Sequence, residues 1–291
     1  MNYTTKYITT TLLSCALSMS VFAAENPFIS AYQTSDTPNL EIQSERISGI
    51  ESFSFKSFDG EVVNGQIGYP NAKQDKYPVL IALHAMGRSF PRWWNAEING
   101  RPTITKSNEI TTIANEKGFA VIAADARFHG SRKSKKLPLS KIITDLRAGD
   151  RAAYDKMITN TVKDYKLLLN WIAEQPQFEG MPVYTVGYSM GAQMALLLSA
   201  ADDRISNVVS IVPPNVETTN AIVSPAKAAP FLQGKDVLLI TANKDEYSTD
   251  SEFASLFDAI SSDSKIRVVH DSGHILPEDY TEVLDFWYSK Q

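Results

Sequence analysis

Residues 183–191 read VYTVGYSMG, a pattern typical of a strand followed by a sharp turn. Its first residues are apolar or β-branched, as in a buried strand, and residues 191–200 are small and apolar, as in a buried helix. The turn between them has the pattern Gly187-x-Ser189-x-Gly191. Side chains two positions before or after the serine would crowd so sharp a turn, so glycine at both places lets the strand and the helix approach closely. The pattern predicts that Ser189 stands above a sheet edge at a helix N-terminus, which favours negative charge.

The chain after Pro78 repeats this alternation of strand and helix. Its short apolar runs have strand length, and strands that are apolar on both sides are typical of a parallel sheet covered by helices on both faces. Such an alternation predicts a three-layer α/β fold with a mostly parallel sheet and right-handed crossovers. We predict strands at 79–83, 120–124, 183–186, 208–212, 237–240 and 266–269, and helices at 160–174, 191–200, 252–260 and 278–288.

An antiparallel hairpin is predicted before the parallel strands. Residues 52–55 read SFSF, a turn signal follows at 59–60, and residues 62–69 can return as the second strand. No repeat or linker divides residues 45–291, so we expect them to form one domain. Residues 24–44 are polar and show little periodicity, which predicts a leader that packs loosely on the surface or is partly disordered.

The first residues have the composition of a secretory signal peptide. A short polar start with Lys6 is followed by an apolar stretch at about 8–22, and small residues follow it at Ala23 and the next position. We therefore expect residues 1–23 to be cut off, or one residue more, and the protein to be exported to the periplasm or secreted. The stretch is shorter than the roughly 20 apolar residues of a membrane anchor. Residues 12–15, LLSC, loosely resemble a lipoprotein cleavage box, but a cut there would leave an apolar N-terminus.

Composition narrows the classes of partner. Cys15 is the only cysteine, so the mature chain would have no thiol for a disulfide, a metal or catalysis. Loss of Lys6 with the signal peptide would take the formal net charge from −5 to −6. The sequence has no block of basic residues, which argues against nucleic acid or an anionic membrane as the main partner. No later apolar run is long enough to remain inserted in a membrane. Four scattered histidines and the lack of a Gly-rich phosphate loop predict neither a metal nor a cofactor. The oligomeric state is not indicated.

Four marks together resemble the α/β-hydrolase superfamily, and within it the compact dienelactone-hydrolase-like and esterase-like members. The first is the turn at 187–191, which alone would also fit a plain Gly-Ser turn. The second is LHAMG at 83–87, where the family commonly has His-Gly-x-Gly, and the third is DARFHGS at 125–131, similar to a family turn. A late Asp and a late His complete the set. The resemblance covers nearly all of residues 50–290 and implies the α/β-hydrolase fold; residues 213–236 are too short for a large cap domain.

The resemblance also implies a serine hydrolase with a Ser-His-Asp triad. A serine hydroxyl is a weak nucleophile unless a base takes its proton and an acid orients that base, and the family's chain order is Ser, Asp, His. Ser189 is the expected nucleophile. Asp245 matches the acid's loop position, with adjacent Glu246 as the alternative. His274 follows a glycine in a loop, as in the family, whereas His270 continues a strand and is expected to be structural.

Two backbone N–H groups are expected to bind the oxyanion that forms during acyl transfer. One belongs to Met190, directly after the nucleophile, and the other to Met86, with Ala85 as the alternative. Ala85 replaces the glycine usual in the family, which leaves the path of this loop open. His84 is expected to brace the same loop, and His129 to order the turn in which it lies.

The walls of the site are less well defined by the sequence. Trp93 and Trp94 fit a pocket wall and core anchors equally well, and the charged loop 132–151 is expected to contribute to the rim. The resemblance, together with these residues, predicts hydrolysis of a small carboxylic ester through an acyl-enzyme. A peptidase or amidase on the same scaffold is the nearest alternative, then acyl transfer to an acceptor other than water, and an inactive relative that only binds its ligand is the alternative from another class.

Overall fold

The computed structural model describes residues 25–34, 41–47, 49–216, 218 and 220–289, so the predicted signal peptide lies outside the described residues. Within this part of the chain, a nine-stranded sheet has the order β1-β2-β3-β7-β4-β8-β9-β10-β11. Its strands are β1 (Glu41–Ile47), β2 (Ile50–Lys56), β3 (Val62–Gly68), β4 (Val79–Leu83), β7 (Ala120–Ala124), β8 (Val183–Tyr188), β9 (Ile205–Ile211), β10 (Asp236–Ala242) and β11 (Lys265–His270). The short strands β5 (Glu97–Ile98) and β6 (Arg101–Pro102) pair separately.

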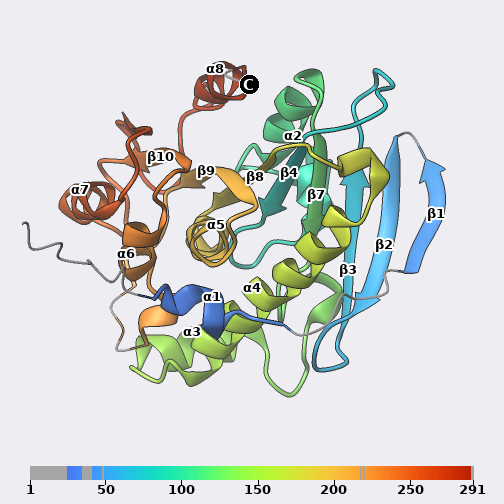
Figure 1. Cartoon of the computed structure of the whole chain (residues 1–291). Helices are drawn as coiled ribbons and strands as arrows, with labels where there is room; N and C mark the ends of the chain where they lie inside the picture. The colour runs from blue at the N-terminus through green and yellow to red at the C-terminus, as the bar shows by residue number, and fades with distance from the viewer. Residues whose placement is uncertain (1–24, 35–40, 48, 217, 219, 290–291) are drawn as a thin grey trace, which may run out of the picture.

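Helices lie on both faces of this sheet, as Figure 1 shows. One face carries α1, α4 and α5 over a core cluster that includes Ile81, Leu168 and Leu197, and the other carries α2 and α8 over a cluster that includes Leu80 and Leu284. The helices are α1 (Pro27–Ala31), α2 (Ser107–Glu116), α3 (Leu139–Arg147), α4 (Ala152–Ala173), α5 (Met190–Ala201), α6 (Pro225–Ala228), α7 (Asp250–Ala259) and α8 (Glu282–Tyr288).

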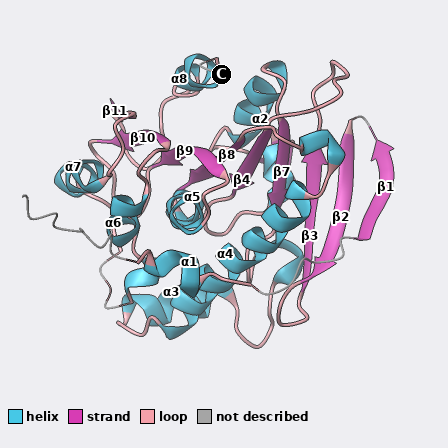
Figure 2. Cartoon of the chain, in the orientation of Figure 1, coloured by secondary structure: helices cyan, strands magenta, loops and turns pink. Residues whose placement is uncertain are grey.

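The sheet is antiparallel at its N-terminal edge and parallel elsewhere (Figure 2). β2 pairs antiparallel with β3 around the turn predicted at 59–60. From β7 to β11 neighbouring strands run parallel, and every residue of β4, β7 and β8 is buried. The predicted three-layer α/β fold with an N-terminal hairpin is therefore confirmed, because strands apolar on both sides need cover on both faces.

The predicted loose leader at 24–44 is wrong for its described part. Residues 27–31 form α1, with Phe28 and Tyr32 buried against the core. Asn26 donates from its side-chain amide to the carbonyl of Ala200 at the end of α5. Polar residues around two large aromatic side chains concealed this contact, because a single helical turn is too short to show periodicity. The strand β1 also begins inside the predicted leader.

A buried ionic cluster joins the antiparallel edge to the helical layer. Arg127, directly after β7, donates to both carboxylate oxygens of Asp164 on α4 at 2.9 and 2.8 Å. It also donates to Asp59 in the β2–β3 turn at 2.5 and 3.1 Å. Arg132 reaches the same Asp164 at 2.7 Å. The turn at 125–131, whose sequence resembled a family motif, thus ties the hairpin to α4.

Candidate active site

The turn after β8 holds Ser189 as predicted. Ser189 has φ 55° and ψ −118°, a strained conformation for a residue with a side chain, and it is the residue before α5. A Cβ on Gly187 would lie 2.1 Å from the carbonyl oxygen of Gly191, and a Cβ on Gly191 would lie 2.0 Å from that of Leu83. Glycine is therefore required at both positions because the neighbouring backbone lies too close for a side chain, as predicted from the sequence.

Three side chains from separate loops meet at the carboxyl ends of the parallel strands. His274 Nε2 lies 2.9 Å from Ser189 Oγ, and His274 Nδ1 lies 2.7 Å from Asp245 Oδ2. Ser189 follows β8, Asp245 follows β10, and His274 follows β11. The structure thus brings together the serine, the acid and the base that the sequence singled out, in a hydrogen-bonded series. In that geometry an imidazole can take a hydroxyl proton while a carboxylate holds its second nitrogen.

Backbone groups of its own loop hold the side chain of Asp245 in place. Its side chain is 0 % exposed, and its Oδ1 accepts the backbone N–H groups of Tyr247 at 2.8 Å and Ser248 at 3.2 Å. Oδ2 is left to face His274. A carboxylate held in this way can orient the imidazole and select the tautomer with the proton on Nδ1.

Glu246, the alternative acid, has a different place in the site. Its Oε2 accepts the backbone N–H of His274 at 2.8 Å, so it anchors the loop rather than the imidazole. Tyr188 donates its hydroxyl to the carbonyl of His274 at 2.5 Å, and the ring of Tyr247 packs edge-on against the imidazole at 4.6 Å between centroids. The sequence did not indicate these three supports, because each depends on where two loops cross.

The other three histidines do not contact Ser189. His270 ends the edge strand β11, and its ring lies edge-on to Tyr280 at 6.4 Å. His84 Nε2 accepts the N–H of Ala126 at 3.0 Å, and its Nδ1 lies 2.9 Å from the carbonyl oxygen of Ala85. His129 Nδ1 lies 2.8 Å from the carbonyl oxygen of Arg127. His84 and His129 thus hold their loops, as expected from the sequence. Burial lowers the pKa of His84 to about 4, so its ring is neutral at neutral pH.

A pocket of about 490 Å³ opens on Ser189 and His274. Both residues expected to bind the oxyanion, Met86 and Met190, line it, and so does Ala85. Met190 begins α5, where a backbone N–H has no partner within the helix and is available to a ligand. Met86, Ala85 and Met190 therefore line the same pocket as Ser189, and Ala85 is buried in its loop with 9 % exposure.

The helix α3 forms one wall of this pocket, in a region that the sequence predicted to be a charged loop. Ile143, Leu146 and Arg147 line the pocket, so the region 132–151 does contribute to the rim, but as a helix from Leu139 onward. The neighbouring Trp93 is buried in the core and Trp94 packs against Gly68, which decides for these two residues in favour of core anchors. The other lining residues are Arg88, Thr105, Tyr154, Tyr188, Pro214, Tyr247 and Ile275.

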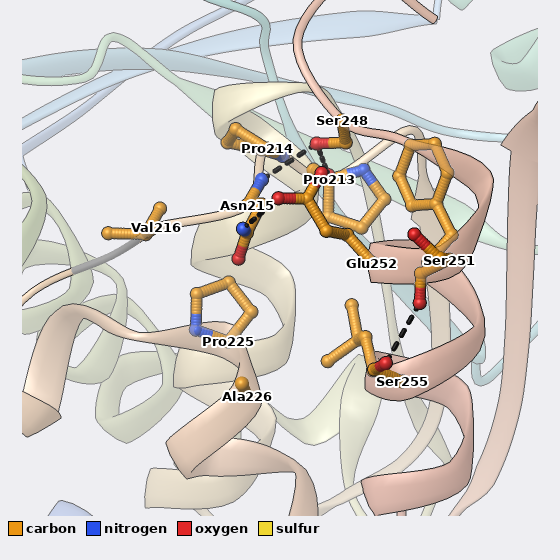
Figure 3. Close-up of a pocket in the computed structure, with 12 residues that line it drawn as sticks. Pro213, Pro214, Asn215, Val216, Pro225, Ala226, Ser248, Ser251, Glu252 and Ser255 are labelled. Carbon is orange, nitrogen blue, oxygen red and sulfur yellow. Dashed lines mark hydrogen bonds between the residues drawn. The ribbon is translucent and has the colours of Figure 1, made fainter. Parts of the chain in front are cut away.

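A second, smaller pocket of about 250 Å³ lies between α6 and α7 (Figure 3). Its polar groups bond to one another: Asn215 donates from its backbone to Ser248 Oγ at 2.8 Å and from its side chain to Glu252 Oε1 at 2.6 Å. Glu252 also completes the capping box of α7. Its lining contains no histidine, and the carboxylate of Glu252 is engaged by Asn215 and by the cap of α7, so this pocket lacks the serine–histidine pair of the larger one.

Metal binding and insertion into a membrane would each require a recognisable feature among the described residues. No group of three or more His, Cys, Asp or Glu side chains there is arranged to hold a metal ion. In the same part of the chain, no helix has both the length and the apolar character needed to span a membrane.

Comparison with known proteins places the fold in a family. A sequence model described as the alpha/beta hydrolase fold matches residues 78–267, which is more than half of the chain. The chain belongs to the alpha/beta hydrolase fold family. The match covers the parallel strands from β4 to β10 and the first residues of β11, and it includes Ser189 and Asp245, while His274 lies beyond it. No curated protein matches the chain.

Several solved structures resemble this alpha/beta hydrolase over most of its length. Acetyl xylan esterase 1 from Thermoanaerobacterium sp. JW/SL YS485 is 18% identical with a TM-score of 0.68, covering 90% of this chain and 91% of its own. An acetyl xylan esterase from Paenibacillus sp. R4 is 14% identical with a TM-score of 0.66, covering 89% and 90%. A protein from Klebsiella pneumoniae assigned as a dienelactone hydrolase is 15% identical with a TM-score of 0.62, covering 83% and 99%. At these identities the likeness establishes a shared fold.

Proposed function

We propose that this alpha/beta hydrolase cleaves carboxylic esters through an acyl-enzyme on Ser189. The observation that carries the proposal is the series Ser189 Oγ, His274 Nε2, His274 Nδ1 and Asp245 Oδ2, joined at 2.9 and 2.7 Å beside an open pocket. The solved relatives named as esterases have the same fold, which adds support for ester substrates.

In the proposed mechanism Ser189 Oγ attacks the ester carbonyl as His274 Nε2 takes its proton. The negative charge on the tetrahedral oxygen is met by the N–H of Met190 and the N–H of Met86, both in the wall of the pocket. The alcohol leaves with the proton from His274. Water then attacks the acyl group, again deprotonated by His274, and releases the acid. Asp245 holds Nδ1–H throughout and stabilises the imidazolium.

A fluorophosphonate probe tests this function, because it reacts covalently with an activated serine. We expect one label on the wild-type protein, at Ser189, and none on Ser189→Ala or His274→Ala. Ser255→Ala, which alters an exposed serine on α7, is the control and should label as the wild type does. Hydrolysis of aryl acetates should fall about 10⁴-fold or more in Ser189→Ala. A folded wild type without label would favour a binding protein, and faster cleavage of aminoacyl amides than of esters would favour a peptidase.

We also propose that the protein is exported after cleavage near residue 23. The composition of residues 1–23 supports this, and so does the position of α1: a cut after residue 23 or 24 leaves Asn26 and its bond to Ala200 intact. The N-terminal residue of the protein recovered outside the cytoplasm should be Ala24 or Glu25. A full-length N-terminus in the cytoplasmic fraction would contradict export.

A further inference from the structure

The arginines of this chain fall into two groups by their partners. In one group each guanidinium pairs with a carboxylate: Arg127, Arg132, Arg151, Arg204 and Arg267. Among the arginines whose side chains the structure describes, the other group makes no ion pair within 4.0 Å: Arg88, Arg92, Arg101 and Arg147. The unpaired arginines are not scattered over the surface, and their location suggests what they bind.

Two of them line the pocket that contains Ser189. Arg88 follows the loop expected to bind the oxyanion and is linked to it by its backbone N–H, which donates to the carbonyl of Ala85 at 3.1 Å. Arg147 lines the pocket from the last turn of α3, and Asp145 on the same helix is already paired with Lys141. The pocket therefore has two cations on separate elements, and no Asp or Glu lines it.

The surroundings of Arg88 strengthen its positive potential. Arg92 is buried, and its guanidinium donates to neutral acceptors, the carbonyl of Arg101 at 2.9 Å and Thr103 Oγ1 at 3.1 Å. Burial lowers the pKa of Arg92, and the positive charges of Arg88 and Arg101 lower it further. Like charges gathered without a carboxylate repel one another, and an anionic ligand would relieve that repulsion.

An apolar surface completes the same pocket. Tyr247 is 66 % exposed although its ring packs edge-on against His274, and Ile275 beside it is 48 % exposed. Large apolar side chains exposed at a pocket rim are typical of a ligand contact. The site thus offers an apolar face and a cationic face around one serine.

We propose that the preferred substrates are esters that carry a carboxylate, bound by Arg88 and Arg147, with an apolar part against Tyr247 and Ile275. This inference rests on the proposed ester hydrolysis at Ser189. Arginine is suited to the task because its planar guanidinium donates two parallel hydrogen bonds to a carboxylate. The molecule as a whole has a formal charge of −5, so local cations are needed to attract an anion to the site.

A matched pair of aryl acetates tests the proposal. 4-Acetoxybenzoate carries the charge and its methyl ester does not, and the ratio of their kcat/KM values reports recognition of the carboxylate. We expect this ratio to fall about 10-fold in Arg88→Gln and in Arg147→Gln, further in the double variant, and in the wild type to fall with added salt. Lys73→Gln is the control: it removes one exposed positive charge near the amino end of β4, away from Ser189, and should leave the ratio unchanged.

The outcomes separate the two proposals. A ratio that stays the same in the double variant overturns the role of the arginines, whereas ester hydrolysis that is lost in Ser189→Ala still supports the proposed function. If the wild type hydrolyses neither ester and takes up no fluorophosphonate, the proposed function fails and the substrate preference fails with it.

Discussion

The backbone of Ser189 is held at a positive φ by its neighbours rather than by its own preference. Its N–H donates to the carbonyl of Ile211 at 2.8 Å, which fixes the turn to the adjacent strand β9. The strain is tolerated because Gly187 and Gly191 allow β8, β4 and α5 to meet without side chains between them. This geometry was predictable because the two glycines and the serine lie between an apolar strand and a helix of small residues, whereas the pattern alone would also fit a plain Gly-Ser turn.

His84 acts on the site through one peptide group. Its Nε2 accepts an N–H from Ala126, so its proton is on Nδ1, which donates to the carbonyl of Ala85. That carbonyl and the N–H of Met86 belong to the same planar peptide, and holding one end sets the direction of the other. We therefore regard His84 as a positioning residue for the oxyanion donor. The sequence indicated the role but not the peptide involved.

Stability should depend on pH through this buried histidine. The pKa of His84 is about 4 in the folded protein and about 6.5 when unfolded, because burial disfavours the charged ring. Between these values the unfolded chain binds a proton that the folded chain does not, so stability is lost as pH falls from 6.5 to 4. We expect a slope of up to about 1.4 kcal/mol per pH unit from this group. His129 contributes with the same sign, since burial and the charge of His84 lower its pKa to about 3.

Urea unfolding of the wild type and His84→Gln across pH 4.5 to 6.5 measures this effect. The glutamine variant should be less stable at pH 7 but should lose less stability on acidification. Equal slopes for both proteins would show that folding does not lower the pKa of His84.

Elements whose whole length is buried were predicted well. The bounds of β4 and β7 agree with the sequence prediction, because strands covered on both faces leave an unbroken apolar run. The helix α3 was missed. Its charged neighbours at 132–151 favoured a loop, although Leu139, Ile142 and Leu146 have helical spacing. Such short amphipathic helices depend on the tertiary surface they cover, which a single sequence does not contain.

The position of α3 predicts an effect on substrate size. Ile143→Trp replaces an aliphatic side chain on the pocket wall with a larger aromatic one. The kcat/KM for bulky esters should therefore fall about 10-fold or more, while that for methyl acetate should change little. Thr144→Trp, on the exposed side of the same helix, is the matched control and should retain the wild-type profile. A panel of esters graded in acyl and alcohol size gives the measurement. Equal responses of the two variants would mean that α3 does not bound the substrate.

At the scale of the whole molecule, the cluster around Asp164 connects the hairpin, the turn after β7 and α4. Asp164 accepts from Arg127 and Arg132, and all three side chains are at most 4 % exposed. Removing one member of such a cluster leaves an uncompensated buried charge. The sequence could not predict this network, because Asp164 lies more than 30 positions from both arginines.

Asp164→Asn should therefore lower the free energy of unfolding by about 3–5 kcal/mol. Asp145→Asn is the control, because it removes the same charge from a surface pair with Lys141 and should cost less than about 1 kcal/mol. Thermal or urea unfolding of both variants gives the comparison. Similar losses in the two variants would assign the cluster no special role in joining the layers.

The proposed transfer of an acyl group to Ser189 can be measured with a carbamate ester. Aryl carbamates transfer a carbamoyl group to an activated serine. The carbamoylated enzyme is hydrolysed slowly enough for its mass to be measured by mass spectrometry. We predict one carbamoyl group on the wild-type chain, located on Ser189. The rate of its formation should be at least about 10²-fold lower in His274→Gln, and Ser189→Ala should form no adduct. Ester turnover without any adduct, or an adduct on another residue, would contradict the account.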